Sequence, residues 1–492
     1  MKKIFLLCSI VLTFLWSEQL PNILLVVSED NGPELGCYGD PYAKTPTLDK
    51  LAEEGVRFAN AFTPFSVCSP SRASFLTGRH PVVNGHLGLA THKFALFQEF
   101  PTIFSLLKKA GYRTGLIGKL HVNPEEAFTR HIDFRAISGA NFSRKQMSAY
   151  AKKAGEFFEE NKKPFFLSIN YPEAHFPLIK QAGGYPIDKN ILRGGEVKPL
   201  PWVGCDSKRL REATANYYNC INRLDSLVSD LLEELDQSGK TGNTLIFYVG
   251  DHGAQFSRGK TSVYDAGNKI PFIVNWPKKI QPGFVRKELV CVTDILPTCL
   301  RVAKVEIPQG VTGRALQPLL FDKDHANWRK SIALITTGAA PAIACLQFAW
   351  RTERYKLIVT PQGQSINLSA DAYLKEYNSF YVAGCTQEEI DASPPHIRKS
   401  YATYLHPPKY ELYDLVNDPE EWDNLAENPK YARTLGEMLD AFQTWQRKIG
   451  DPFANPDHVS FWLDEQQKNL GGNYRANKKF RWGYLDRFGK NE

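Results

Sequence analysis

The segment from Val67 to Gly78 holds the side chains with the clearest potential for chemistry. It reads Val-Cys-Ser-Pro-Ser-Arg-Ala-Ser-Phe-Leu-Thr-Gly, and we predict that Cys68 stands at the start of a helix. Free backbone N–H groups at a helix start create a positive local field, which favours the approach of an anion. Arg72 adds a planar cation one turn along. The segment therefore predicts an anion site built around a cysteine.

Four further polar groups follow predicted strands. Apolar runs indicate strands at residues 22–27, 113–117, 165–170 and 244–249. The polar side chains that come after these runs are Asp30, Lys119, His175 and Asp251. In an open α/β sheet, ligands bind outside the carboxyl ends of the strands. We therefore expect these four groups to converge, although they are far apart in the sequence.

The elements that must position these groups alternate between strand and helix. Helical patterns occupy residues 47–54, 102–110 and 208–237, which predicts an α/β fold with a large, mostly parallel sheet sandwiched by helices. From about residue 330 the pattern changes, since residues 342–360 indicate antiparallel strands and residues 431–449 an amphipathic helix. We therefore expect a catalytic domain at residues 18–330 and a smaller C-terminal α+β domain at residues 331–492.

The segment around Cys68 resembles the signature of the sulfatase family. That signature is Cys-x-Pro-Ser-Arg followed a few residues later by Leu-Thr-Gly or Met-Thr-Gly, and it is matched here by Cys68, Pro70, Ser71, Arg72, Thr77 and Gly78. The resemblance implies an alkaline phosphatase-like fold. It also implies that a maturation enzyme oxidises Cys68 to formylglycine, whose hydrate attacks the sulfur of a sulfated substrate.

The resemblance extends to a metal site. It implies that Glu29, Asp30, Asp251, His252 and the side chain at position 68 bind a divalent cation. Two positions depart from the family pattern, because most sulfatases have aspartate in place of Glu29 and asparagine in place of His252. The three carboxylates favour Ca²⁺. Imidazole is a softer ligand and leaves Mn²⁺ or Zn²⁺ open.

Three further family motifs supply the remaining site residues. Gly118-Lys119-Leu120-His121 matches the family's Gly-Lys-x-His, His175 matches its second histidine, and Lys260 its second lysine. The resemblance implies that Arg72, Lys119 and Lys260 neutralise the sulfuryl group. It further implies that His175 or Lys260 protonates the leaving group and that His121 assists release of sulfate.

The substrate class is open to more than one interpretation. Residues 66–78, 114–122 and 445–452 are most similar to the heparan N-sulfatase (N-sulfoglucosamine sulfohydrolase) subfamily, which favours hydrolysis of sulfate esters or sulfamates of sulfated glycans. The pair Asp251-His252 also occurs in relatives of the same superfamily, so a phosphodiesterase or phosphonate monoester hydrolase is the alternative enzyme. A non-catalytic glycan-binding protein is the third hypothesis.

Composition restricts the partners and the location. The 492 residues carry a net charge of +7 with scattered basic residues, a pattern that does not indicate nucleic-acid binding. Lys2 and Lys3 precede an apolar run at residues 4–16, which is typical of a secretory signal and short for a membrane span. We therefore expect residues 1–17 to be a signal peptide, the protein to be secreted or periplasmic, and no stable membrane partner.

Overall fold

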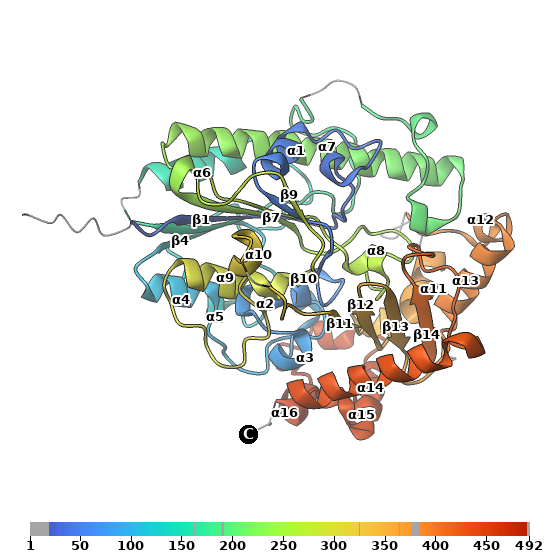
Figure 1. Cartoon of the computed structure of the whole chain (residues 1–492). Helices are drawn as coiled ribbons and strands as arrows, with labels where there is room; N and C mark the ends of the chain where they lie inside the picture. Colours follow the sequence, from blue (N-terminus) through green and yellow to red (C-terminus); the bar gives the residue numbers. More distant parts are fainter. Residues whose placement is uncertain are drawn as a thin grey trace, which may run out of the picture.

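The computed structural model describes residues 19–160, 163–187, 191–323, 325–363, 365–375 and 383–489. The predicted signal peptide at residues 1–17 lies outside these residues. The fold prediction is confirmed, since a large sheet flanked by helices is joined to a smaller antiparallel sheet (Figure 1). Within the described part of the chain, no helix combines the length and the apolar character needed to cross a membrane.

The large sheet has eight strands in the order β5-β4-β6-β1-β7-β8-β2-β9. Its central strands β1 (Asn22–Ser28), β6 (Phe165–Asn170) and β7 (Thr244–Gly250) are parallel and entirely buried, because their apolar runs are covered on both faces. The outer strands are β4 (Arg113–Gly118), β5 (Phe134–Ala136), β8 (Phe272–Asn275), β2 (Val56–Phe58) and β9 (Phe284–Arg286). Only β8 runs antiparallel to its neighbours β7 and β2.

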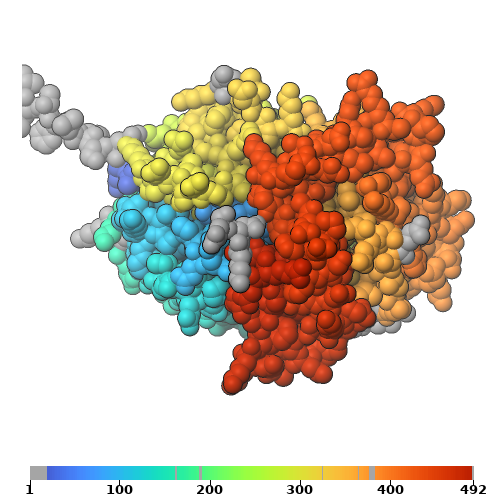
Figure 2. Space-filling view, turned by 90° about the horizontal axis from the view of Figure 1, so that it is seen from below, coloured from blue at the N-terminus to red at the C-terminus, as the bar shows by residue number. Residues whose placement is uncertain are grey.

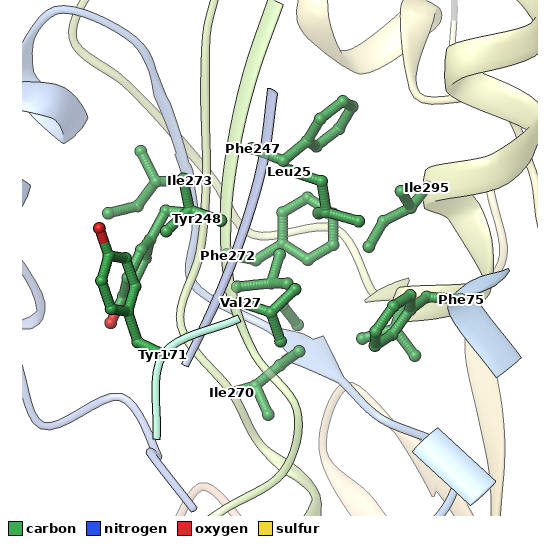
Figure 3. Packing of buried hydrophobic residues seen from close by; sticks show 14 of the residues in the cluster. Leu25, Val27, Phe75, Tyr171, Phe247, Tyr248, Ile270, Phe272, Ile273 and Ile295 are labelled. Carbon is green, nitrogen blue, oxygen red and sulfur yellow. The ribbon is translucent and has the colours of Figure 1, made fainter. Parts of the chain in front are cut away.

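Helices cover both faces of this sheet, as Figure 1 shows. One face carries α1 (Pro46–Glu53), α6 (Ala149–Glu159) and α7 (Lys208–Gln237). The other carries α2 (Cys68–Thr77), α4 (Ile103–Lys109) and α9 (Ile295–Val302). The two layers pack on opposite sides of the central strands, with Phe75 and Ile295 on one side and Tyr171 and Ile273 on the other (Figure 3).

The second sheet is antiparallel and contains β11 (Ser331–Thr336), β12 (Gln347–Thr352), β13 (Tyr355–Val359) and β14 (Tyr410–Asp414). Helices α14 (Ala432–Ile449), α15 (Pro456–Lys468) and α16 (Tyr484–Phe488) complete this part. Within the expected range of residues 342–360 the first strand, β12, begins only at Gln347, because Pro341 opens a short 3-10 turn. Strand β11 precedes the expected range. In Figure 2 the red C-terminal helices lie against the blue and cyan N-terminal segments.

Short elements connect these layers. The remaining strands are β3 (Ala61–Phe62) and β10 (Val290–Cys291), which pair with each other. The remaining helices are α3 (Pro81–Asn84), α5 (Glu126–Thr129), α8 (Asp265–Asn268), α10 (Gln317–Leu320), α11 (Leu368–Lys375), α12 (Gln387–Asp391) and α13 (Pro395–Leu405). The proposed domain boundary at residue 330 falls between α10 and β11, and it stays a prediction.

Candidate active site

Cys68 is the first residue of α2, as the sequence predicts. Val67 before it is extended, and every residue of the helix is buried. The first intrahelical contact is the bond from the Ser71 N–H to the Val67 carbonyl at 3.1 Å. The N–H groups before it have no partner within the helix, so the helix start presents donors beside the Cys68 side chain.

The carboxylates converge on this helix start from two adjacent strands. Glu29 and Asp30 follow β1, Asp251 follows β7, and the ends of these strands are paired at Ser28 and Gly250. The Asp30 N–H donates to Asp251 Oδ1 at 3.1 Å. The neighbouring strands therefore place three buried acids, distant in sequence, next to Cys68.

These acids form two groups of possible metal ligands that share Cys68. One group is Asp30, Cys68 and His252, and the other is Glu29, Cys68 and Asp251, with the ligand atoms of each group within 4.8 Å of one another. All five residues are buried, and within the described part of the chain Glu29 Oε2 has no hydrogen-bond partner. Carboxylate oxygens with one imidazole are a donor set that suits a divalent cation. The residues present therefore fit the metal that the family uses.

Buried cations stand opposite these acids. Arg72 Nη2 lies 3.1 Å from Asp251 Oδ2 and 3.5 Å from Glu29 Oε1. Lys119 forms an ion pair with Glu29, and Lys260 Nζ lies 2.9 Å from Asp30 Oδ2. Burial alone would raise the pKa of both Glu29 and Asp30, but the facing cations hold each pKa below its ordinary value.

The same charges act on the thiol and the imidazole. Burial opposes ionisation of Cys68, yet Lys119, Lys260 and His252 lower the pKa of its thiol to about 5. His252 Nε2 lies 3.3 Å from Cys68 Sγ. Burial would lower the pKa of His252, but Asp251, Asp30 and Cys68 raise it to about 9. The site therefore stabilises negative charge at position 68 before any metal binds.

A pocket of about 370 Å³ opens above Cys68. Five of the predicted site residues line it: Cys68, Lys119, His121, His175 and Lys260. The other five do not line the pocket, and they lie behind its wall, where they contact one another, the lysines and Cys68: Arg72, Glu29, Asp30, Asp251 and His252. The predicted set is thus brought together as an inner charged layer and an outer layer that faces the pocket.

The backbone holds the two histidines in different ways. The backbone of His121 has a positive φ of 59°. Gly118, three residues before it, has a φ of 87°, and a Cβ at this position would lie 2.3 Å from the Asn170 carbonyl oxygen, so the position requires glycine. Among the residues that the structure describes, neither ring nitrogen of His121 has a hydrogen-bond partner. Burial together with Lys119 keeps the pKa of His121 well below the ordinary value. The ring of His175 is fixed by an Nδ1 contact to the Phe176 carbonyl at 2.8 Å.

Three residues of the site were missed by sequence reasoning. Asn170 Oδ1 accepts from Arg72 Nη1 at 2.7 Å, and its place at the end of a buried strand could have indicated it. Gln255 accepts from Lys260 Nζ at 3.3 Å. Phe142 stacks on His175, with ring centroids 4.1 Å apart and 16° between the planes. It lies in a loop, where no sequence pattern distinguishes it.

Comparison with known proteins places this site in a family. The family model described as sulfatase matches residues 21–305, and the model described as N-sulphoglucosamine sulphohydrolase, C-terminal, matches residues 250–373. An ulvan-active sulfatase of Formosa agariphila is 29% identical and aligns over 88% of this chain and 81% of its own length. The N-sulphoglucosamine sulphohydrolase of Homo sapiens is 28% identical, over 89% of this chain and 92% of its own length.

Solved structures share the fold. BT4656, in complex with its substrate D-glucosamine-2-N,6-O-disulfate, aligns with a TM-score of 0.66 at 20% identity, over 88% of this chain and 99% of that one. A protein from Bacteroides fragilis described as the putative sulfatase yidJ aligns with a TM-score of 0.68 at 23% identity, over 88% and 97%. These alignments extend across the large sheet and into the C-terminal part.

Proposed function

The chain belongs to the sulfatase family, whose members are sulfuric ester hydrolases, and we propose that it hydrolyses sulfate esters or sulfamates of a sulfated glycan. The observation that carries the proposal is the pocket over Cys68, which two lysines and two histidines line beside the start of α2. The proposal of a glycan substrate is supported by the two relatives, because the name of each refers to a sulfated carbohydrate.

Position 68 supplies the nucleophile in this proposal. A maturation enzyme would oxidise Cys68 to formylglycine, which when hydrated offers a hydroxyl group for attack on sulfur. The surroundings favour that role, because Lys119, Lys260 and the free N–H groups of α2 stabilise negative charge at this position. The modification fits an environment that already lowers the pKa of the thiol.

The metal would be held by Glu29, Asp30, Asp251, His252 and the side chain at position 68. When bound, a divalent cation favours the deprotonated hydroxyl and neutralises charge on the sulfuryl group. We propose Ca²⁺, because three of these residues are carboxylates. His252 makes Mn²⁺ and Zn²⁺ the competitors to be tested.

The residues of the chain divide the remaining work by position. Lys119 and Lys260 line the pocket, where they donate to the oxygens of the sulfuryl group, while Arg72 holds Asp251 and Glu29 in place from behind. His175 lines the pocket and protonates the leaving oxygen or nitrogen. His121, whose ring nitrogens have no hydrogen-bond partner among the described residues, accepts the proton when sulfate is released.

We also propose that the protein is exported, with residues 1–17 as the signal peptide. The charged start and the short apolar run support this. Mapping the N-terminus of protein recovered from the periplasm or the medium tests the proposal. A chain recovered only in the cytoplasm, with Met1 or Lys2 at its start, would overturn it.

The first experiment is mass spectrometry of the peptide that contains Cys68, from protein made in a host that matures other sulfatases. Formylglycine is lighter than cysteine by about 18 Da, a covalent change of the residue that this measurement detects directly. The same preparation is then assayed for sulfate release from N-sulfated and O-sulfated sugars, with Cys68→Ala as the matched control. Unmodified Cys68 together with no sulfate release would reject the proposal.

A second candidate function follows from one observation. His252 lies 3.3 Å from both Cys68 Sγ and Asp30 Oδ1, a ligand set that differs from the oxygen-only pattern of most sulfatases. This favours a phosphodiesterase or phosphonate monoester hydrolase as the competitor. Turnover of 4-nitrophenyl sulfate and of bis(4-nitrophenyl) phosphate by one preparation separates them, since a sulfatase prefers the first and the competitor the second.

A further inference from the structure

The positive charge of the pocket is confined to its inner end. Its lysines, Lys119 and Lys260, are the pair that the proposed function assigns to the sulfuryl group. Cys68, His121 and His175 line the pocket beside these lysines. The other eleven lining residues are Leu89, Thr91, Leu120, Glu125, Ser138, Ala140, Phe142, Gln255, Thr261, Ala339 and Ile343. Of these described residues, Glu125 alone carries a charge, and the charge is negative. We call these eleven residues the mouth.

Phe142 makes the mouth apolar close to the reacting group. Its ring lies flat against the ring of His175, and Lys119 Nζ lies 5.0 Å from the Phe142 ring centroid. The same aromatic side chain therefore contacts the proposed proton donor and a proposed sulfate-binding lysine. A leaving group held by His175 must pass beside an apolar surface, which suits the C–H face of a sugar ring and offers no donor to a second anion.

Glu125 sets the electrostatic character of the mouth. It directly precedes α5, and its side chain is 57% exposed. Its Oε1 lies 2.9 Å from Arg135 Nη2, and Arg135 does not line the pocket. The guanidinium of Arg135 is thus engaged with this carboxylate. A second anion on the substrate would meet this carboxylate without a matching cation, a repulsive element of the kind that produces specificity.

We propose that the mouth selects a sugar whose only anionic group is the sulfate to be removed. Hydroxyl or ammonium donors of that sugar face Glu125, and its apolar face packs on Phe142. This inference rests on the proposed function and deepens it by naming the substrate class. A residue with a second sulfate is disfavoured because the mouth supplies one negative charge and no positive one.

The test compares substrates that differ by one anion. The probes are glucosamine 2-N-sulfate, glucosamine 6-O-sulfate and glucosamine 2-N,6-O-disulfate, with 4-nitrophenyl sulfate as a reference that carries no sugar. We expect the wild-type kcat/KM for the preferred monosulfate to exceed that for the disulfate by about fivefold, the size of effect that a half-exposed charge produces. A wild-type enzyme that prefers the disulfate overturns the inference.

Substitutions assign the preference to Glu125. Glu125→Gln is expected to reduce the monosulfate preference about threefold and Glu125→Lys to reverse it, both read from the ratio of kcat/KM for the monosulfate to kcat/KM for the disulfate. Glu126→Gln is the matched control, because it removes the same charge from the next residue, which does not line the pocket. An unchanged preference in Glu125→Lys overturns the inference.

The same assay distinguishes two kinds of failure. If the wild-type enzyme releases sulfate from all probes without regard to the second anion, the inference about the mouth is wrong and the proposed function stands. If matured enzyme releases sulfate from none of them, 4-nitrophenyl sulfate included, the proposed function is wrong and the inference falls with it.

Discussion

The two ends of the pocket differ in charge and in burial. At the inner end, three acids, two lysines, Arg72 and His252 are buried and face one another at ion-pair distances. The mouth is lined by six apolar side chains, four uncharged polar ones and one half-exposed carboxylate, Glu125. The inner end derives from strand ends, the start of α2 and the loop that carries Lys260, whereas the mouth is assembled from loops and from Ala339 and Ile343 of the C-terminal part.

This difference separates reaction from selection. Buried charges are costly unless each has an opposite partner, so the inner end tolerates little change, and its groups are held in place before substrate arrives. The mouth has few such constraints, because apolar and half-exposed side chains can be exchanged at small cost. Under the proposed function, the inner end determines which bond is broken, and the mouth determines which substrate is accepted.

Removal of the nucleophile should have the largest effect. Cys68→Ala is expected to lower kcat/KM for sulfate release by at least about 10⁴-fold, because no other group in the pocket replaces the attacking hydroxyl. Steady-state assays with 4-nitrophenyl sulfate measure this. Cys37→Ala, at a free cysteine outside the pocket, is the control and should keep wild-type activity. Residual activity above one hundredth of wild type in Cys68→Ala would show that the inner end does not depend on this residue.

Loss of one inner cation should have the next largest effect. Lys260→Met is expected to lower kcat/KM about 100-fold, the usual size for a group that stabilises developing charge, and Lys260→Arg should recover part of it. Sulfate release is measured alongside thermal unfolding, which verifies that each variant is folded despite the altered pairing of Asp30. The exposed Lys278→Met serves as control. A decrease below threefold in Lys260→Met would contradict direct contact with the sulfuryl group.

The strand pattern alone predicts that Asp30, Lys119, His175 and Asp251 converge, whereas Glu29, His252 and Lys260 are predicted only by the resemblance to the sulfatase motifs. Phe142, Ala339 and Ile343 of the mouth are not predicted at all. The buried runs at residues 22–28 and 244–250 can form only central strands, and once they are parallel neighbours the polar groups after them must meet. Phe142 has no such constraint, because its loop lacks periodicity. Ala339 and Ile343 join the mouth through the packing of the C-terminal part, which no local pattern encodes.

The C-terminal segment also supports the mouth from behind. Trp482 Nε1 donates to the His92 carbonyl at 3.0 Å, and the Trp482 ring stacks on Phe94 with centroids 4.7 Å apart. Both contacts hold the chain next to Leu89 and Thr91, which line the pocket. The shape of the mouth therefore depends on a residue almost 400 positions away in the sequence.

Loosening this support should affect binding more than chemistry. Trp482→Leu is expected to raise KM about tenfold and leave kcat within twofold, because a hydrogen bond and a stacked contact that order the loop are lost together. Trp482→Phe retains the stacking and should recover most of the loss. The exposed Arg487→Ala, on the same segment, is the control. A fall in kcat as large as the rise in KM would contradict the separation of the two ends.

Glu34 is a buried acid close to the inner end, but its pKa is shifted in the opposite direction from the pKa of Glu29. Glu34 lies five residues after Glu29 and is also buried, but among the described residues no lysine or arginine lies within ion-pair distance of it, and its Oε2 accepts from the Tyr217 hydroxyl at 2.6 Å. Burial therefore raises the pKa of Glu34 to about 8, whereas facing cations lower that of Glu29. Glu34 does not line the pocket above Cys68.

Glu34→Gln should leave kcat/KM within twofold and change only the pH dependence of stability. Because the folded pKa of about 8 is above the ordinary value of 4.5, the folded state binds an extra proton between these values, so wild-type stability falls as pH rises through that window. Glutamine keeps an acceptor for Tyr217 and does not titrate. The variant should therefore gain stability relative to wild type between pH 5 and pH 8.5, by roughly 2–4 kcal/mol. Thermal unfolding at both pH values measures this gain, and the exposed Glu54→Gln is the control. If the difference in stability between Glu34→Gln and wild type is the same at both pH values, Glu34 is ionised like the acids of the inner end.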